Sequence, residues 1–206
     1  PMKSNGMLIL VRHGQSEWNK KNLFTGWKDP DLTKKGVQEA NSVGKLLLRK
    51  KIKFHTMFTS DLIRAQKTGE IILKILNQQN IETISNKALN ERDYGDLSGL
   101  NKDEAKKRWG EKQVQRWRRS FDEPPPGGES LKETADRVIP FFKKNICPFI
   151  LEGKNILITA HGNSLRALIM YLKSLNPIEV IKLEIATGQP IAFSMNPEGK
   201  INQIEI

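Results

Sequence analysis

Residues Leu8–Asn19 read LILVRHGQSEWN, and this stretch decides the fold. Its first four residues are apolar, and the run ends abruptly at Arg12, His13 and Gly14. The pattern predicts a buried β-strand that delivers a cation, an imidazole and a glycine to its carboxyl end, where open α/β sheets usually bind ligands. The hypothesis that follows is that His13 is a nucleophile that carries a phosphoryl group.

The chain of 206 residues is long enough for one well-buried domain, predicted to span residues 1–206. Hydrophobic residues make up 37% and charged residues 28%, and no apolar run approaches the roughly 18 residues that span a bilayer. Residues 1–6 lack the character of a signal peptide and are expected to be disordered or derived from cloning, since Pro1 is no natural initiator. The single cysteine, Cys147, allows no intrachain disulfide, so a reducing cytoplasm is expected.

The formal net charge of +11 has three interpretations: a solvated basic surface, an anionic small substrate, or nucleic acid. The arginines are more informative than the scattered lysines, because Arg is the better clamp for phosphate and carboxylate. Four of them stand beside other polar residues, namely Arg12, Arg64, Arg118 and Arg119.

Short apolar runs alternate with amphipathic stretches of ten or more residues along the chain. Strands are predicted at 8–11, 56–60, 81–84, 155–160, 191–195 and 201–206. The main helices are predicted from Thr33 to Arg49, from Ser60 or Asp61 to Asn77, over 102–109 and 111–119, from Ser130 with a kink at Pro140, over 162–175 and over 178–183. The fold class is therefore three-layer α/β/α with a mostly parallel sheet and an antiparallel edge. Residues 88–128 are expected to form an insertion that covers the sheet.

In the first long helix, Val37, Ala40, Val43 and Leu47 share one face at helical spacing, which predicts that all four point into the core.

A second His-Gly pair, His161-Gly162, also follows an apolar strand. Two histidines at equivalent strand ends indicate a shared site, whereas His55, just ahead of a strand, fits a structural role. Metal spacings such as HExxH are absent, and Arg12 beside His13 would repel a cation. A serine hydrolase lacks its G-x-S-x-G motif, so Ser16 and Ser164 fit phosphate ligands or helix caps.

Phosphoryl transfer explains more of these residues. A neutral imidazole is a competent nucleophile, and a loose transition state needs positioning and cations around its oxygens. The candidates around the phosphoryl group are Arg12, Arg64, His161, Asn19 and Asn163. The acceptor alcohol must lose a proton, and Glu91 is the best candidate carboxylate; the alternative is a surface carboxylate paired with Arg92.

Six blocks in order, RHGQSEWN, FTGWKDPDLT, NERDYGDLSGLNK, WRRSFDEPPPGGES, HGNSLRAL and TGQP, carry a resemblance over about residues 8–190. They resemble the cofactor-dependent phosphoglycerate mutases of the histidine phosphatase superfamily. The RHG triplet alone indicates only the superfamily, whereas the FTGWKD, NERDYG…LNK and WRR blocks are specific to the mutases.

The resemblance implies that His13 is phosphorylated, that Glu91 is the proton donor and acceptor, and that Arg12, Arg64 and His161 hold the transferring group. The substrate contacts it implies are Gly14, Gln15, Ser16, Glu17, Trp18, Asn19, Thr25, Gly26, Arg92, Asp93, Tyr94, Lys102, Arg118, Arg119, Gly162 and Asn163. It implies interconversion of 3-phosphoglycerate and 2-phosphoglycerate through 2,3-bisphosphoglycerate, which also primes the histidine. The resemblance implies no metal cofactor, no nucleic-acid partner and no membrane association. It does not decide whether the protein forms a homodimer.

Three departures from the family pattern lead to expectations. Asp93 stands where many members have histidine, the segment between Arg119 and Ser130 is short, and the chain stops at Ile206 without a long tail. Because the tail that often closes over the site in this family is largely missing, we expect a somewhat more open site with higher side phosphatase activity. The remaining alternatives are a phosphatase of the same superfamily, which has no need of Lys102, Arg118 and Arg119, and a basic nucleic-acid-binding protein.

Overall fold

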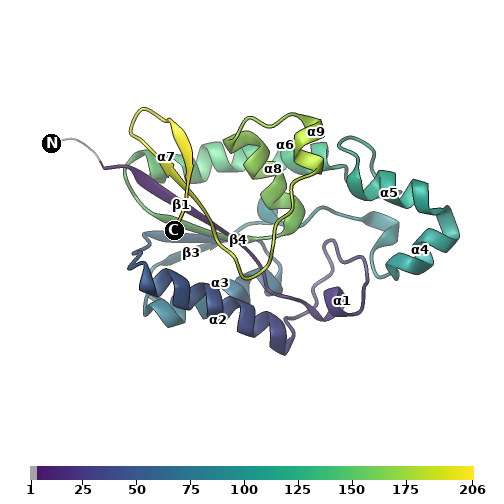
Figure 1. The fold of residues 1–206 in the computed structure, drawn as a ribbon, viewed down its shortest axis with the longest axis horizontal. Helices are drawn as coiled ribbons and strands as arrows, with labels where there is room; N and C mark the ends of the chain where they lie inside the picture. The colour runs from purple at the N-terminus through teal and green to yellow at the C-terminus, as the bar shows by residue number, and fades with distance from the viewer. Residues whose placement is uncertain (1–3) are drawn as a thin grey trace.

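The computed structural model describes residues 4–206, and its centre is a six-stranded sheet in the order β3-β2-β4-β1-β5-β6 (Figure 1). Strands β1 to β4 pair in parallel, whereas β5 and β6 are antiparallel. The fold class predicted from the sequence is confirmed. The strands are β1 (Gly6–Arg12), β2 (Thr56–Thr59), β3 (Glu82–Ser85), β4 (Ile156–Ala160), β5 (Ile191–Met195) and β6 (Ile201–Ile204).

Helices cover both faces of this sheet (Figure 1). One face packs against α2 (Lys34–Arg49) and α3 (Ile63–Leu76), through a core that includes Ile9, Val43 and Ile72. The other face packs against α6 (Leu131–Phe141), α7 (Cys147–Leu151) and α8 (Gly162–Leu172). Because both faces are covered, β1 and β4 are apolar on both sides, which is typical of parallel strands.

Helix α2 begins at the predicted cap, since Thr33 accepts a hydrogen bond from the Gly36 amide. The prediction that Val37 points into the core is wrong, because Val37 is 38% exposed. The buried face instead passes through Gly44, where an added Cβ would lie only 2.9 Å from Cδ1 of Ile75. Val37 therefore lies beyond the edge of the face of α2 that packs against the sheet and α3.

The predicted cap of α3 is also wrong. Its N-cap is Leu62, without a side-chain hydrogen bond. The Ser60 hydroxyl instead accepts from the Leu62 amide (3.2 Å) and bonds Nε2 of His161 (2.7 Å). The Ser60 side chain therefore bonds His161 at the end of β4 and does not cap α3.

Residues 88–128 contain α4 (Lys102–Trp109) and α5 (Glu111–Arg119), which coincide with the two predicted helices. A short 3₁₀ turn, η2 (Gly95–Leu97), interrupts the predicted loop. These elements share a small apolar cluster with Phe24. In Figure 1 they stand beside α1 (Glu17–Lys20), off the carboxyl end of β1, so they border the edge of the sheet where the strands end.

Several further boundaries differ from the predictions, most of them by one or two residues. Gly6, placed in the disordered start, opens β1 by pairing with Met195, while residues 1–3 lie outside the described part of the chain. The helix that contains Pro140 changes after Phe141 to a π-helix over Phe142–Ile146. Helix α8 ends at Leu172, and α9 (Pro177–Ile181) follows. Within residues 4–206, no helix has the length and apolarity needed to cross a membrane.

Candidate active site

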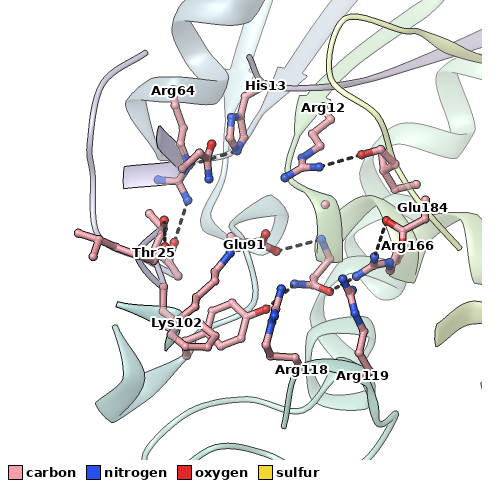
Figure 2. A pocket seen from close by; sticks show the side chains of 18 residues that line it. Arg12, His13, Thr25, Arg64, Glu91, Lys102, Arg118, Arg119, Arg166 and Glu184 are labelled. Atoms are coloured by element: carbon pink, nitrogen blue, oxygen red, sulfur yellow. Dashed lines mark hydrogen bonds and ion pairs between the residues drawn. The ribbon is translucent and has the colours of Figure 1, made fainter. Parts of the chain in front are cut away.

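A polar pocket of about 130 Å³ opens at the carboxyl ends of β1 and β4 (Figure 2). Thirteen of the predicted site residues line it, contributed by segments that are far apart in the chain: Arg12, His13, Asn19, Thr25, Gly26, Arg64, Glu91, Tyr94, Lys102, Arg118, Arg119, Gly162 and Asn163. The structure therefore brings together the two strand ends, the loop after α1 and the region of α4 and α5.

His13 is buried at the base of the pocket, with 3% of its surface exposed. Its Nδ1 lies 2.6 Å from the Gly14 carbonyl oxygen. Because a carbonyl only accepts, Nδ1 carries the proton and Nε2 keeps its lone pair. Burial, and then the charges of Arg64 and Arg12, lower the pKa of His13 well below its usual 6.5. The imidazole is therefore neutral at neutral pH, the state that a nucleophile requires.

His161 lies beside His13, with 4.9 Å between the ring centroids, and it is fully buried. Its Nε2 bonds the Ser60 hydroxyl, and its amide donates to the Ser164 hydroxyl at the start of α8. Burial, followed by Arg64 and His13, lowers the pKa of His161 well below 6.5. His161 itself does not line the pocket, so it supports the wall behind His13.

Two arginines flank the imidazole of His13. Arg64, 1% exposed, donates Nε to Nε2 of His13 (3.3 Å) and its other nitrogens to the carbonyls of Lys28 and Gly26. Burial lowers the pKa of Arg64 to about 10, which leaves it charged at neutral pH. Arg12 donates Nη1 to the Ile185 carbonyl, while its buried Nε has no partner among the described residues. An unpaired buried donor next to a neutral histidine suits an anionic oxygen.

Glu91 faces the same space from the loop after β3 (Figure 2). Its Oε1 accepts from the amides of Asn163 (3.0 Å) and Arg92 (2.8 Å), and Oε2 has no partner within residues 4–206. Glu91 is therefore not the surface carboxylate paired with the Arg92 guanidinium that the sequence left open. One of its oxygens is held and the other is available for proton transfer.

Three cations form the wall opposite His13 (Figure 2). Lys102 of α4 and Arg118 of α5 both lie over the ring of buried Phe24, 5.7 and 5.9 Å from its centre. Burial, with the charges of Arg118, Arg12 and Arg119, lowers the pKa of Lys102 to about 8. Among the described residues none of these three side chains has an ion-pair partner. A cleft lined by charge of one sign in this way attracts small anions.

The seven other predicted site residues do not line the pocket, and several have structural bonds instead. The Ser16 hydroxyl accepts from the Asn19 amide as the cap of α1. Arg92 is 1% exposed and donates Nε to the Glu129 carbonyl, while Asp93 accepts from the Gly95 amide. Gly14 permits close packing, since a Cβ there would lie 2.2 Å from the Gly36 carbonyl oxygen. The remaining three are Gln15, Glu17 and Trp18.

Sequence reasoning missed five lining residues, Leu23, Phe24, Arg166, Glu184 and Ile185. Arg166 donates Nη1 to the Asn163 side chain (2.9 Å) and Nε to the Leu183 carbonyl (2.6 Å). Its position three residues after Asn163 on a helix was an available signal, because such residues share a face. Glu184 lies 3.8 Å from Arg166 on an irregular segment that offers no comparable signal.

The lining carries six cationic side chains and two carboxylates, a formal excess of four positive charges. A bisphosphorylated acid carries about four to five negative charges, since each phosphate contributes about −1.5 to −2. The charge of the pocket therefore matches a small, highly anionic ligand. No group of three or more His, Cys, Asp or Glu side chains within residues 4–206 is arranged to hold a metal ion.

Comparisons with known proteins agree with this geometry. The family model described as histidine phosphatase superfamily (branch 1) matches residues 8–203. A Parvibaculum lavamentivorans protein named 2,3-bisphosphoglycerate-dependent phosphoglycerate mutase is 57% identical over 97% of this chain and 95% of its own length. The chain belongs to the histidine phosphatase superfamily and, within it, to the family of the 2,3-bisphosphoglycerate-dependent phosphoglycerate mutases.

Solved structures share the fold at lower identity. An α-ribazole phosphatase from Shigella flexneri has a TM-score of 0.83 at 23% identity, covering 97% of this chain and 95% of its own. A phosphoglycerate mutase from Bacillus anthracis str. Sterne has a TM-score of 0.80 at 23% identity, covering 99% and 93%. Because a phosphatase and a mutase match equally well, the fold alone does not separate the two activities.

Proposed function

We propose that this chain is a 2,3-bisphosphoglycerate-dependent phosphoglycerate mutase that interconverts 3-phosphoglycerate and 2-phosphoglycerate through phosphorylated His13. The observation that carries the proposal is the set of unpaired cations, Lys102, Arg118 and Arg119, across the pocket from the neutral imidazole. A phosphatase needs only the histidine end, whereas a mutase must hold a second anionic group while the first is transferred.

In the first transfer the 2-hydroxyl of 3-phosphoglycerate gives its proton to Glu91 as its oxygen bonds phosphorus, and the N–P bond of phosphorylated His13 breaks, which leaves 2,3-bisphosphoglycerate. In the second transfer Nε2 of His13 forms the bond to the phosphorus of the 3-phosphate while the bond from that phosphorus to the 3-oxygen breaks. Glu91 returns the proton to this oxygen, which leaves 2-phosphoglycerate. Throughout, Nδ1 of His13 keeps its proton and donates it in a hydrogen bond to the Gly14 carbonyl. This bond fixes the tautomer in which Nε2 is free to react.

The cations around His13 act on the phosphoryl oxygens. Arg64 is held by two carbonyls and Arg12 has an unpaired Nε, so both present donors with little reorganisation. The neutral side chain of His161, whose Nδ1 has no hydrogen-bond partner among the described residues, is proposed to act beside these cations, together with neutral donors from Asn19, Gly162 and Asn163.

The opposite wall is proposed to bind the carboxylate and the second phosphate, through Lys102, Arg118, Arg119, Tyr94, Thr25 and Gly26. When bound, 2,3-bisphosphoglycerate supplies the phosphoryl group that primes His13. The proposal needs no metal, and activity unchanged by excess EDTA tests that part. The proposed setting is glycolysis and gluconeogenesis in the cytoplasm.

One assay separates mutase from phosphatase: conversion of 3-phosphoglycerate to 2-phosphoglycerate with and without trace 2,3-bisphosphoglycerate. We expect conversion that depends on the bisphosphate and little free phosphate. Phosphate release without isomerisation would overturn the proposal in favour of the phosphatase. Lack of retention on heparin at low salt would exclude the nucleic-acid-binding alternative.

A further inference from the structure

Arg137 of α6 lies outside the pocket, yet its guanidinium holds the loop that carries Glu91. We propose that Arg137 is a positioning residue that fixes the Glu91 carboxylate for proton transfer. The inference rests on the role proposed above for Glu91. It assigns a residue that neither the sequence motifs nor the pocket lining singled out.

Four main-chain carbonyls in and beside the Glu91 loop accept hydrogen bonds from this one guanidinium, the longest being that of Lys87 to Nη1 (3.4 Å). Nη1 donates to the carbonyls of Ala88 (2.8 Å) and Asn90 (2.9 Å), and Nη2 donates to that of Glu91 itself (2.8 Å). The loop has little regular structure of its own, only the 3₁₀ turn η1 (Lys87–Leu89). Arg137 therefore replaces the ladder bonds that a helix or strand would have provided.

A carboxylate holds Arg137 in turn. Glu129 accepts from Nε (2.9 Å) and Nη2 (2.8 Å), and both side chains are only 20% exposed. Burial alone would raise the pKa of Glu129, but the bond and charge of Arg137 lower it, so the carboxylate is ionised. Glu129 also accepts from the Asp93 amide, two residues after Glu91. The pair thus clamps the loop on both sides of Glu91.

The Glu91 carbonyl accepts a second side-chain hydrogen bond, from Trp27 in the loop after α1. Trp27 donates Nε1 to the Glu91 carbonyl (2.6 Å), and the Arg137 guanidinium lies 5.4 Å from the centre of its ring. Trp27 follows Thr25 and Gly26, which line the pocket. The backbone of Glu91 is consequently held between the substrate-side loop and α6.

Lysine at position 137 would keep the charge but lose the planar fork that reaches Glu129 and the carbonyls together. Displacement of a catalytic group by about 1 Å can slow a reaction by about a hundredfold. Arg137→Lys is therefore expected to slow the steps that need Glu91 while sparing those that do not.

Two phosphoryl donors distinguish a transfer that needs the Glu91 proton from one that does not. Departure of the 2,3-bisphosphoglycerate oxygen needs a proton, whereas 4-nitrophenolate leaves p-nitrophenyl phosphate without one. The measurement is the single-turnover rate of His13 phosphorylation from each donor, in wild type, Arg137→Lys and Glu91→Gln. Arg116→Lys is the matched control, because Arg116 also faces a glutamate, Glu123, at 3.7 Å, but within the described part of the chain its side chain makes no hydrogen bond to a carbonyl of residues 87–91.

We expect Arg137→Lys to slow phosphorylation from the bisphosphate by about tenfold to a hundredfold and from p-nitrophenyl phosphate by less than threefold. Equal slowing with both donors, or none, would overturn the inference. Should Arg137→Lys not fold, Trp27→Phe, which removes the second donor to the Glu91 carbonyl, is expected to show a smaller effect of the same selectivity. If Glu91→Gln slows phosphorylation of His13 equally from both donors, the role proposed for Glu91 is overturned, and this inference with it.

Discussion

The imidazoles of His13 and His161 meet edge to face, with centroids 4.9 Å apart and an interplanar angle of 61°. Strand pairing accounts for the contact. β1 and β4 are parallel neighbours in the register Arg12 to Ala160, so the next residue of each strand arrives at the same height. Two unpaired motifs in the sequence become one buried pair because the sheet places their strands side by side.

His13→Gln is expected to lower mutase activity by more than about 10³-fold, because no other described side chain takes the position of Nε2. Intact wild-type enzyme incubated with 2,3-bisphosphoglycerate should gain about 80 Da on the peptide that contains His13. Mass spectrometry of digested phosphoenzyme checks this. His55→Gln serves as the control and should retain both activity and label; a label on His161 would reverse the assigned roles.

The stability of the protein should fall as the pH drops below about 6.5. Both strand-end histidines have a lowered pKa when folded, so in that range the unfolded chain takes up protons that the folded state excludes. The free energy of unfolding should decrease by up to about 1.4 kcal/mol per pH unit for each histidine. Urea unfolding at pH 7.5 and 5.5 measures it. His161→Asn should reduce the slope, and equal stability at both pH values would contradict the lowered pKa.

Substrate affinity should weaken above about pH 8. Lys102 has its pKa lowered to about 8, so raising the pH through that value removes a positive charge from the pocket. KM for 3-phosphoglycerate is expected to rise above pH 8, approaching about tenfold per pH unit, with kcat little changed. In Lys102→Arg the guanidinium stays charged and the rise should disappear below pH 9.5. The same rise in that variant would assign the effect to another group.

Gly36→Ala is expected to destabilise the fold by about 1–3 kcal/mol. An added Cβ would lie 2.2 Å from the Gln15 carbonyl oxygen, so α2 or the segment after His13 must shift. Thermal unfolding measures the loss, and Gln38→Ala, exposed on the same helix, should change stability by less than about 0.5 kcal/mol. The segment that must shift includes Gly14, next to His13, so activity should fall as well. An unaltered kcat in Gly36→Ala would contradict this coupling between the helix and the site.

The sequence predicted the parts of the fold and site that depend on local pattern. Strand ends with His-Gly and the caps at Thr33 and Ser130 carry their signals in a few adjacent residues. Helices α4 and α5 were predicted to the residue because Asn101 and Gly110 delimit them.

What escaped prediction depends on packing between distant segments. Val37 has the right helical spacing but is exposed, because spacing along a helix does not show how much of its apolar face the neighbouring elements cover. Arg137 reads as an ordinary helix-surface arginine until α6 is seen against the Glu91 loop. Glu184 reaches the pocket on an irregular segment, which has no periodicity to interpret.

The sheet order has a consequence for synthesis on the ribosome. β1 is made first, yet its two neighbours are β4 and β5, which begin at Ile156 and Ile191. For most of translation its apolar run has no strand to pair with and must be shielded by transient contacts or chaperones. The nascent chain also lacks Ile185, whose carbonyl holds Arg12. His13, the proposed nucleophile, thus emerges early but stays without the residues proposed to surround the phosphoryl group until the segment through Ile185 has been made.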